Sequence, residues 1–272
     1  MRRLIPVLLV VALGCVSTSS AASGLPTFLF PVVGTTHYSD DFGQPRGGSI
    51  HQGNDLLADK RAPAIAVEAG TIEYWTTSSS AGCMLYLKGD SGTMYEYIHL
   101  NNDLTAANDN KGKCIQGVSY AVPDGSHVDA GQTIGYVGDS GDANGIHPHL
   151  HFEVHPHGGK AVDPFPYLKK AAHLLVSAPP AGAPFTLKLT GTVVSADVTE
   201  LQLAVTSLAA WPSHLKQKMN RVLFLTLPAA DSGTATFTTG EKIIAWTLPA
   251  PGTIEALTGM PGALSLDRAL PR

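Results

Sequence analysis

Short apolar runs alternate with polar turns from Thr27 to about Leu168. The runs are rich in β-branched, aromatic and aliphatic residues, the turns contain Gly, Asp, Asn and Ser, and no helical period persists over three turns. This pattern is typical of an antiparallel β domain. The strands that it predicts are Ala64–Val67, Thr71–Trp75, Met84–Leu87, Thr93–Leu100, Thr133–Val137 and Leu150–Val154.

A second β region follows a segment rich in proline. Residues 177–184, SAPPAGAP, carry no charge and indicate a semi-rigid linker. We therefore place a first domain at 23–176 and a small all-β domain at 185–272, with one helical turn near Ser213–Asn220. An OB-like fold or another small barrel suits this second domain. Its predicted strands are Phe185–Leu189, Thr192–Ser195, Leu201–Val205, Val222–Leu227, Lys242–Leu248 and Thr253–Thr258.

The N-terminus has the pattern of an export signal. Two arginines precede an apolar stretch at Leu4–Val16, and small residues follow it, so we expect residues 1–22 to be removed. The stretch is shorter than the roughly 20 residues needed to cross a bilayer. An alternative is a lipid anchor, because residues 12–15, ALGC, resemble a bacterial lipobox ending at Cys15. Either route predicts a periplasmic or extracellular protein.

Composition narrows the choice of partners. The chain has 272 residues, a formal net charge of −4 and only 15% charged residues. Such a chain has no bulk positive field, and we therefore expect no nucleic-acid partner. We also expect a monomer.

The cysteines predict one disulfide bond. Removal of the leader leaves Cys83 and Cys114, which would meet an oxidising environment after export. Their bond would close a loop of about 30 residues and pin the polar insertion at 101–122. Two buried thiols are the alternative.

Histidines are concentrated in one segment, with five of the eleven between positions 147 and 157. Alternate residues of an extended strand share a face. The residues between these polar positions are apolar, which predicts a strand with one chemical face and one core face. The chemical face carries His147, His149, His151, Glu153 and His155.

Two upstream motifs add candidate chemistry. His51 and Asp55 offer an imidazole and a carboxylate four residues apart, and Gly53 between them would let the backbone turn tightly. Together with the H-x-H pair downstream they supply the three protein ligands of a catalytic zinc site. His99 ends an alternating run, where a side chain can reach a site without being a ligand. Taken alone, each motif also fits an ordinary surface or strand histidine.

Taken together, the motifs resemble those of the M23 metallo-endopeptidases, the lysostaphin-like or LytM-like enzymes that cut peptidoglycan peptides. The resemblance covers about 135 residues, from Phe30 to Tyr167. It rests on the segments YSDDFGQPR (38–46), HQGNDL (51–56), AVEAG (66–70), YIHL (97–100), VDAGQTIGYVG (128–138), HLHFE (149–153) and VDP (162–164).

This resemblance implies that His51, Asp55 and His151 are zinc ligands and that His149 and His99 are the catalytic histidines. It implies an antiparallel β-sheet groove with the metal on its floor. The expected function is an exported zinc endopeptidase that hydrolyses peptide bonds of bacterial peptidoglycan, with water activated by the metal and assisted by the two histidines. A non-catalytic peptidoglycan-binding or hydrolase-activating relative, or an adhesion protein acting through residues 185–272, are the alternatives.

Some positions depart from the family pattern. Residues 60–63, KRAP, replace the Gly-Thr-Pro that is common in the family, and an insertion carrying Cys114 follows His99. We expect both changes to lie around the groove and to affect substrate preference. His147, His155 and His157 match no ligand position of the family, and His147 is the best alternative ligand among them.

Overall fold

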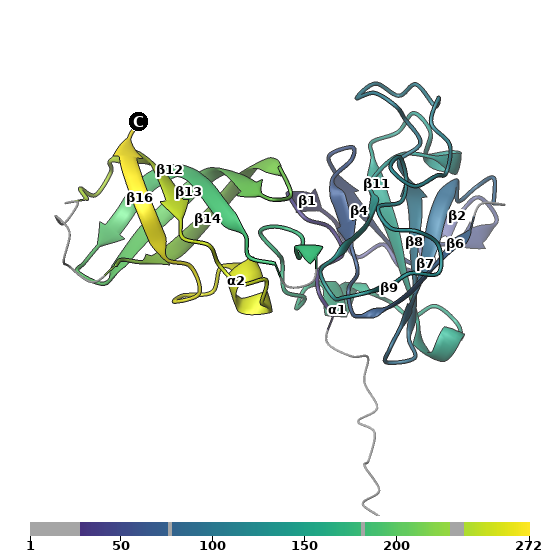
Figure 1. Ribbon diagram of the computed structural model, residues 1–272. Coiled ribbons are helices and arrows are strands. Elements are labelled where there is room, and N and C mark those ends of the chain that lie inside the picture. Colours follow the sequence, from purple (N-terminus) through teal and green to yellow (C-terminus); the bar gives the residue numbers. More distant parts are fainter. Residues whose placement is uncertain (1–27, 76–77, 181–182, 229–236) are drawn as a thin grey trace, which may run out of the picture.

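The computed structural model describes residues 28–75, 78–180, 183–228 and 237–272, which form two β lobes (Figure 1). The N-terminal lobe is coloured purple to teal and the C-terminal lobe green to yellow. The predicted export signal at 1–22, with Cys15, lies outside the described residues.

An antiparallel sheet of seven strands forms the N-terminal lobe, in the order β1-β4-β11-β8-β7-β6-β9. Two smaller pairs, β5 with β10 and β2 with β3, accompany it. Short helical segments are η1 (Gly141–Ala143), η2 (Pro156–Gly158) and α1 (Phe165–Leu168). The strands are β1 (Thr36–His37), β2 (Pro45–Arg46), β3 (Ser49–Ile50), β4 (Asn54–Ala58), β5 (Pro63–Ile65), β6 (Gly70–Trp75), β7 (Cys83–Gly89), β8 (Met94–Leu100), β9 (His127–Val128), β10 (Thr133–Tyr136) and β11 (His149–His155).

Strand β11 has the two faces that its sequence predicts. Leu150, Phe152 and Val154 are fully buried in the main hydrophobic core, where the Phe152 ring meets the edge of Tyr97 at 5.3 Å between centroids. The alternate residues project from the other face. The apolar residues therefore hold the strand in place while the polar ones remain available for chemistry.

Gly53 serves a different purpose from the tight turn that we expected. Its φ does not lie in the left-handed region, and residues 54–58 continue as strand β4, which the sequence pattern did not predict. A Cβ atom at position 53 would lie 2.3 Å from the carbonyl oxygen of Phe152. The glycine is thus required because the backbone of β11 passes directly against it.

The predicted disulfide is confirmed: Cys83 is bonded to Cys114 across 31 residues. Lys60, one of the residues that we expected around the groove, is not among the residues that line it. Its Nζ atom lies 2.5 Å from Asp103 Oδ2 and 3.0 Å from Asp139 Oδ1, and both carboxylates are buried. Lys60 therefore anchors the base of the 101–122 loop, away from the groove.

The C-terminal lobe contains a five-stranded antiparallel sheet in the order β14-β13-β12-β15-β16. Its edges approach each other, because Thr226 near the end of β14 forms a parallel bridge with Ser265, just before β16. The OB-like barrel stays a prediction. The strands are β12 (Thr186–Ala196), β13 (Glu200–Trp211), β14 (Lys216–Thr226), β15 (Lys242–Thr247) and β16 (Leu266–Pro271).

Two expectations for strands β12 and β14 are corrected. The two strands predicted at 185–189 and 192–195 are one continuous strand that passes through Gly191, where a Cβ atom would lie 2.4 Å from Ala204 O. The bulge at this point lies on the facing strand, because Thr190 and Gly191 pair with Ser207 and Val205 and leave Thr206 unpaired. The helical turn predicted near Ser213–Asn220 is mostly β14, whose first residues pair with the end of β13.

The strand predicted at Thr253–Thr258 is also wrong. Residues Ile254–Thr258 form helix α2, and the Thr253 hydroxyl caps its N-terminus by accepting a hydrogen bond from the Ala256 N–H. Gly259 then ends the helix with φ +66°.

The segment between the lobes is packed on the N-terminal lobe. The Ala178 N–H donates to Gly131 O at 2.8 Å, and the Thr133 hydroxyl donates to Ser177 Oγ at 2.7 Å. Leu29 and Ile65 of the first lobe belong to the same hydrophobic cluster as the buried residues of the C-terminal sheet. The two lobes thus share packed apolar surface, while the exact domain limits at 176 and 185 stay a prediction.

Within the four described ranges, no helix has the length and apolar character needed to cross a bilayer.

We expect the disulfide to stabilise the fold substantially. The chain-entropy model gives about 3–4 kcal/mol for a closed loop of this size. Reduction should lower the free energy of unfolding by that amount, measured by denaturant titration with and without a reducing agent. A Cys83→Ala/Cys114→Ala variant should match the reduced protein and lose its sensitivity to reductant. Equal stability of the oxidised and reduced proteins would contradict this role.

Candidate active site

A groove of about 380 Å³ lies over the polar face of the main sheet. Strands β4, β8 and β11 contribute Asp55, His99, His149, His151 and Glu153, and His51 lies on the segment between β3 and β4. The β2–β3 hairpin, residues 80–81 and the segment around η1 contribute the surrounding residues, including Arg46, Ile50, Asp142 and Ile146. All five residues singled out from the sequence as metal ligands or catalytic groups line this one groove: His51, Asp55, His99, His149 and His151.

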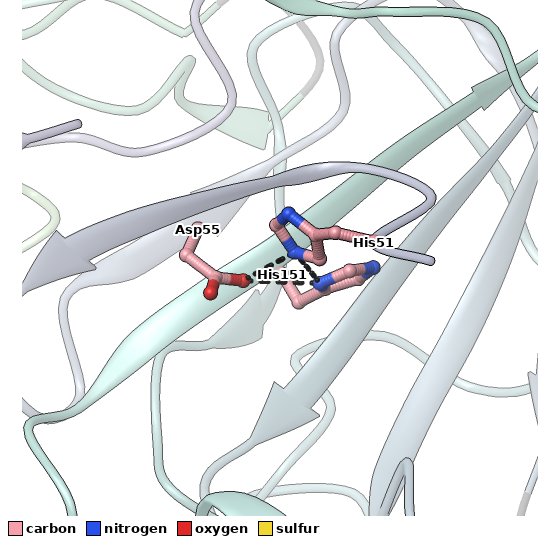
Figure 2. Close-up of side chains that lie close together, drawn as sticks. All are labelled: His51, Asp55 and His151. Carbon is pink, nitrogen blue, oxygen red and sulfur yellow. Dashed lines mark hydrogen bonds and ion pairs between the residues drawn. The ribbon is translucent and has the colours of Figure 1, made fainter. Parts of the chain in front are cut away.

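His51, Asp55 and His151 form a compact triangle (Figure 2). His51 Nε2 lies 3.1 Å from Asp55 Oδ1 and 2.9 Å from His151 Nδ1, and the third edge, from His151 Nδ1 to Asp55 Oδ1, is 3.0 Å. Asp55 and His151 are direct cross-strand partners of β4 and β11. Side chains opposite each other on one face of such a pair are close neighbours, so strand register alone brings these two together.

The hydrogen bonds around the triangle fix which nitrogen of each histidine faces inward. His51 donates from Nδ1 to the carbonyl oxygen of Asp41 at 2.8 Å, which leaves a lone pair on Nε2. His151 has the opposite arrangement, donating from Nε2 to Glu153 Oε1 at 2.8 Å and leaving its lone pair on Nδ1. When both rings are neutral, two nitrogen lone pairs and a carboxylate oxygen therefore converge on one point.

This donor set fits a zinc ion. Converging lone pairs require a positive charge between them, and two imidazoles with one carboxylate are ordinary zinc ligands. For metal–ligand distances of about 2.0–2.1 Å, the ligand atoms on one face of a tetrahedron are about 3.3 Å apart. The observed edges of 2.9–3.1 Å are close to that value.

The pKa shifts of Asp55 and His151 also indicate that the triangle favours a positive charge at its centre. Burial alone would raise the pKa of Asp55, but hydrogen bonds with His151, His51 and Arg46 outweigh it and hold that pKa well below its usual range. Burial alone would lower the pKa of His151, yet its hydrogen bonds to Asp55 and Glu153 raise it to about 9. Arg46 Nη2 donates to Asp55 Oδ2 at 2.6 Å, which occupies the carboxylate oxygen that the histidines do not use.

Behind His151, a chain of buried groups continues along the same strand. Glu153 accepts from His151 with one oxygen, and its other oxygen lies 2.7 Å from His155 Nε2. His155 in turn donates from Nδ1 to Gly159 O at 2.9 Å, and Glu96 Oε1 lies 3.4 Å from its Nε2. The i, i+2 spacing on the polar face placed these residues in line, but their link to His151 was not predicted.

His149 and His99 stand beside the triangle with their ring centroids 5.0 Å apart. Each donates from Nδ1 to a backbone carbonyl: His149 to His147 O at 3.0 Å and His99 to Ser140 O at 2.9 Å. Each Nε2 thus has no backbone partner among the residues that the structure describes. His149 Nε2 lies 3.8 Å from Asp55 Oδ1, and His99 Nε2 lies 3.7 Å from Asp142 Oδ1.

His99 is held neutral by its surroundings. Burial is the main cause, and the neighbouring His149 and His151 add to it, lowering the pKa of His99 to about 4. Its backbone φ of +61° places it in the left-handed region, uncommon for residues other than glycine. The His99 side chain lines the groove at this point.

The remaining histidines of the cluster lie apart from the triangle. His147 and His157 are exposed and do not line the groove. Tyr97 is fully buried; its hydroxyl donates to Ile65 O at 2.8 Å and accepts from the Val67 N–H. Arg46 and Asp41 were not predicted as site residues, because their roles depend on contacts between distant parts of the fold.

Comparison with known proteins gives a family match over the segment that carries the site. Residues 49–164 match Peptidase family M23. The chain is 26% identical over 157 residues to the L-Ala–D-Glu endopeptidase of Bacillus subtilis, covering 54% of this chain and 44% of that protein. It is 28% identical over 131 residues to lysostaphin of Staphylococcus simulans, covering 46% of this chain and 23% of that protein.

Among solved structures, the catalytic domain of lysostaphin from Staphylococcus simulans matches 49% of this chain and 92% of its own length, with 28% identity and a TM-score of 0.39. The chain spans less than half the length of the curated relatives named above.

Glu153 should control how tightly a metal is held at the triangle. Glu153→Ala removes the acceptor that orients His151, and we expect affinity for Zn²⁺ to fall about 10- to 100-fold in competition with a chelator. Glu153→Gln keeps an oxygen acceptor and should lose much less. His157→Ala, at an exposed histidine outside the groove, serves as the control. Unchanged affinity in Glu153→Ala, with the fold intact by thermal unfolding, would contradict this role.

Proposed function

The chain carries a peptidase family M23 domain at residues 49–164, and on this premise we propose that it is a zinc metallo-endopeptidase that hydrolyses peptide bonds of bacterial peptidoglycan. The observation that carries the proposal is the triangle of His51, Asp55 and His151, with its inward lone pairs set by hydrogen bonds. Two further histidines stand within the same groove.

The ligands that we assign to the zinc ion are His51 Nε2, Asp55 Oδ1 and His151 Nδ1. A zinc ion bound there would lower the pKa of a water molecule and polarise the carbonyl of the bond to be cut. The hydrogen bonds from Arg46 to Asp55 and from His151 to Glu153 keep the ligand atoms oriented, so little reorganisation is needed when the ion binds.

His99 and His149 are suited to different parts of the proton transfer. His99 is neutral at neutral pH, and its Nδ1–H is engaged with Ser140 O, so its Nε2 can accept a proton from the attacking water. A proton carried by His149 Nε2 would lie near the Asp55 carboxylate. It could be donated to the carbonyl oxygen or to the leaving amine of the peptide bond that is cut. Exchange of these two roles is the alternative assignment.

The substrate class is supported by the named relatives, which are an L-Ala–D-Glu endopeptidase and lysostaphin. The groove is open to solvent and carries polar and apolar residues on its sides, such as Asp142 and Ile146, as an extended peptide requires. The export signal predicted at residues 1–22 would place the enzyme where the cell wall lies, and the Cys83–Cys114 bond agrees with an oxidising compartment.

Two variants should separate metal binding from catalysis. Asp55→Ala removes one of the three ligands, and we expect it to lose zinc and peptide cleavage together. His149→Ala should keep about one zinc per chain and lose roughly 100-fold or more in turnover, because it removes a proton donor only. Elemental analysis and release of soluble wall peptides are the two measurements.

His157→Ala is the matched control and should keep both properties. Full turnover in His149→Ala would overturn its catalytic assignment, and full zinc content in Asp55→Ala would overturn the assigned ligand set.

A further inference from the structure

The C-terminal sheet bears a concentration of positive charge on its outer face. Lys188 on β12 lies opposite Ala209 on β13, which lies opposite Lys216 on β14. In the adjacent row, Thr190 on β12 lies opposite Ser207 on β13, which lies opposite Lys218 on β14. Directly opposed residues project from the same side of a sheet, so these side chains form one surface, which we call the cationic face.

A groove of about 440 Å³ runs over the cationic face. It is lined by Lys188, Lys216 and Lys218 together with the hydroxyl residues Thr190 and Ser207. In the part of the chain that the structure describes, no carboxylate residue lines it. Among the described residues none of the three lysines forms an ion pair, in contrast to Lys60 and Lys88 of the N-terminal lobe.

The positive row continues across the rest of the sheet. Lys188 lies opposite Trp246 on β15, which lies opposite Arg268 on β16. The Trp246 ring has Lys188 Nζ at 5.6 Å and Arg268 Cζ at 4.9 Å from its centroid. Arg268 Nη1 lies 3.8 Å from a carboxylate oxygen of its neighbour Asp267. Adjacent strands are about 4.8 Å apart, so the cations Lys216, Lys188 and Arg268 recur roughly every 10 Å across the sheet.

The two lobes differ in net charge. Residues 185–272 contain seven basic and six acidic residues, whereas residues 23–184 contain nine basic and sixteen acidic residues. The cationic face therefore stands out against a chain that is negative overall, and an anionic ligand would be attracted to it and repelled elsewhere.

We propose that the cationic face binds a phosphodiester-linked sugar or polyol polymer of the bacterial cell wall and so holds the enzyme on its substrate. Ammonium groups bind phosphate oxygens as point charges, and the Thr190 and Ser207 hydroxyls can donate hydrogen bonds to the same oxygens. A row of cations on successive strands suits a long anion with repeated charges better than a single small one. The wall location of this polymer rests on the proposed function.

The test uses the full chain carrying His149→Ala, which prevents digestion of the wall during the assay. The fraction of protein that pellets with purified sacculi is measured before and after chemical removal of their phosphodiester-linked polymers. We expect the removal to abolish most pelleting. With about three phosphate contacts, a rise in salt from about 50 to about 200 mM should weaken binding about 20-fold.

A Lys188→Gln/Lys216→Gln/Lys218→Gln variant should lose pelleting to the same extent as removal of the polymers. The matched control is Lys160→Gln/Lys169→Gln/Lys170→Gln, which makes the same charge change at exposed lysines of the other lobe and should pellet normally. Thermal unfolding and zinc content establish that both variants are folded.

Inorganic polyphosphate should compete with the sacculi, whereas polyglutamate, with carboxylate charges, should compete weakly. Equal pelleting of the triple variant, or equal binding to stripped sacculi, would overturn the proposal. Stronger competition by single-stranded DNA than by polyphosphate would also overturn it and indicate a nucleic-acid surface. Cleavage of a soluble wall peptide by the chain with His149 intact is a separate measurement, so failure of the proposed function would be recognised independently.

Discussion

The candidate site depends on the antiparallel register between β4 and β11. That register sets Asp55 directly opposite His151 and places Gly53 against the backbone of Phe152, where a Cβ atom would lie 2.3 Å from a carbonyl oxygen. A shift by one residue would turn the histidines into the core and the apolar residues outward. The buried side chains of Leu150 and Phe152 make such a shift costly, so the same packing that stabilises the sheet also fixes the distance between the ligand atoms.

Hydrogen bonds made behind the groove also orient the histidine rings of the site. His51, His149 and His99 each donate from Nδ1 to a backbone carbonyl, whereas His151 donates from Nε2 to Glu153. Because each ring uses one nitrogen for support, the other is left for metal binding or proton transfer. Such an arrangement is preorganised, since the orientation of each ring is set before a metal or a substrate arrives.

The sequence was most informative where one pattern determined one structure. The alternation in residues 149–155 predicted a strand with a chemical face, and the cysteine count predicted the disulfide; both are confirmed. Features that depend on contacts between distant segments were not predicted. Gly53 indicated a tight turn in the sequence, whereas in the fold it is required by the close approach of β11. The role of Arg46 depends on its hydrogen bond to Asp55, which only the fold brings about. Helix α2 was taken for a strand although Thr253 and Gly259 are its cap and terminator, because a five-residue helix gives no periodicity to detect.

The most direct test of the account is the mass of the products released from purified sacculi by the zinc-loaded protein in water enriched in ¹⁸O. We expect intact glycan chains and peptides with new amino ends, each with one ¹⁸O atom in the new carboxyl end, and no release by His149→Ala. Products cut within the glycan, or release that persists in both the metal-free protein and His149→Ala, would contradict the assignment of peptide hydrolysis to this site.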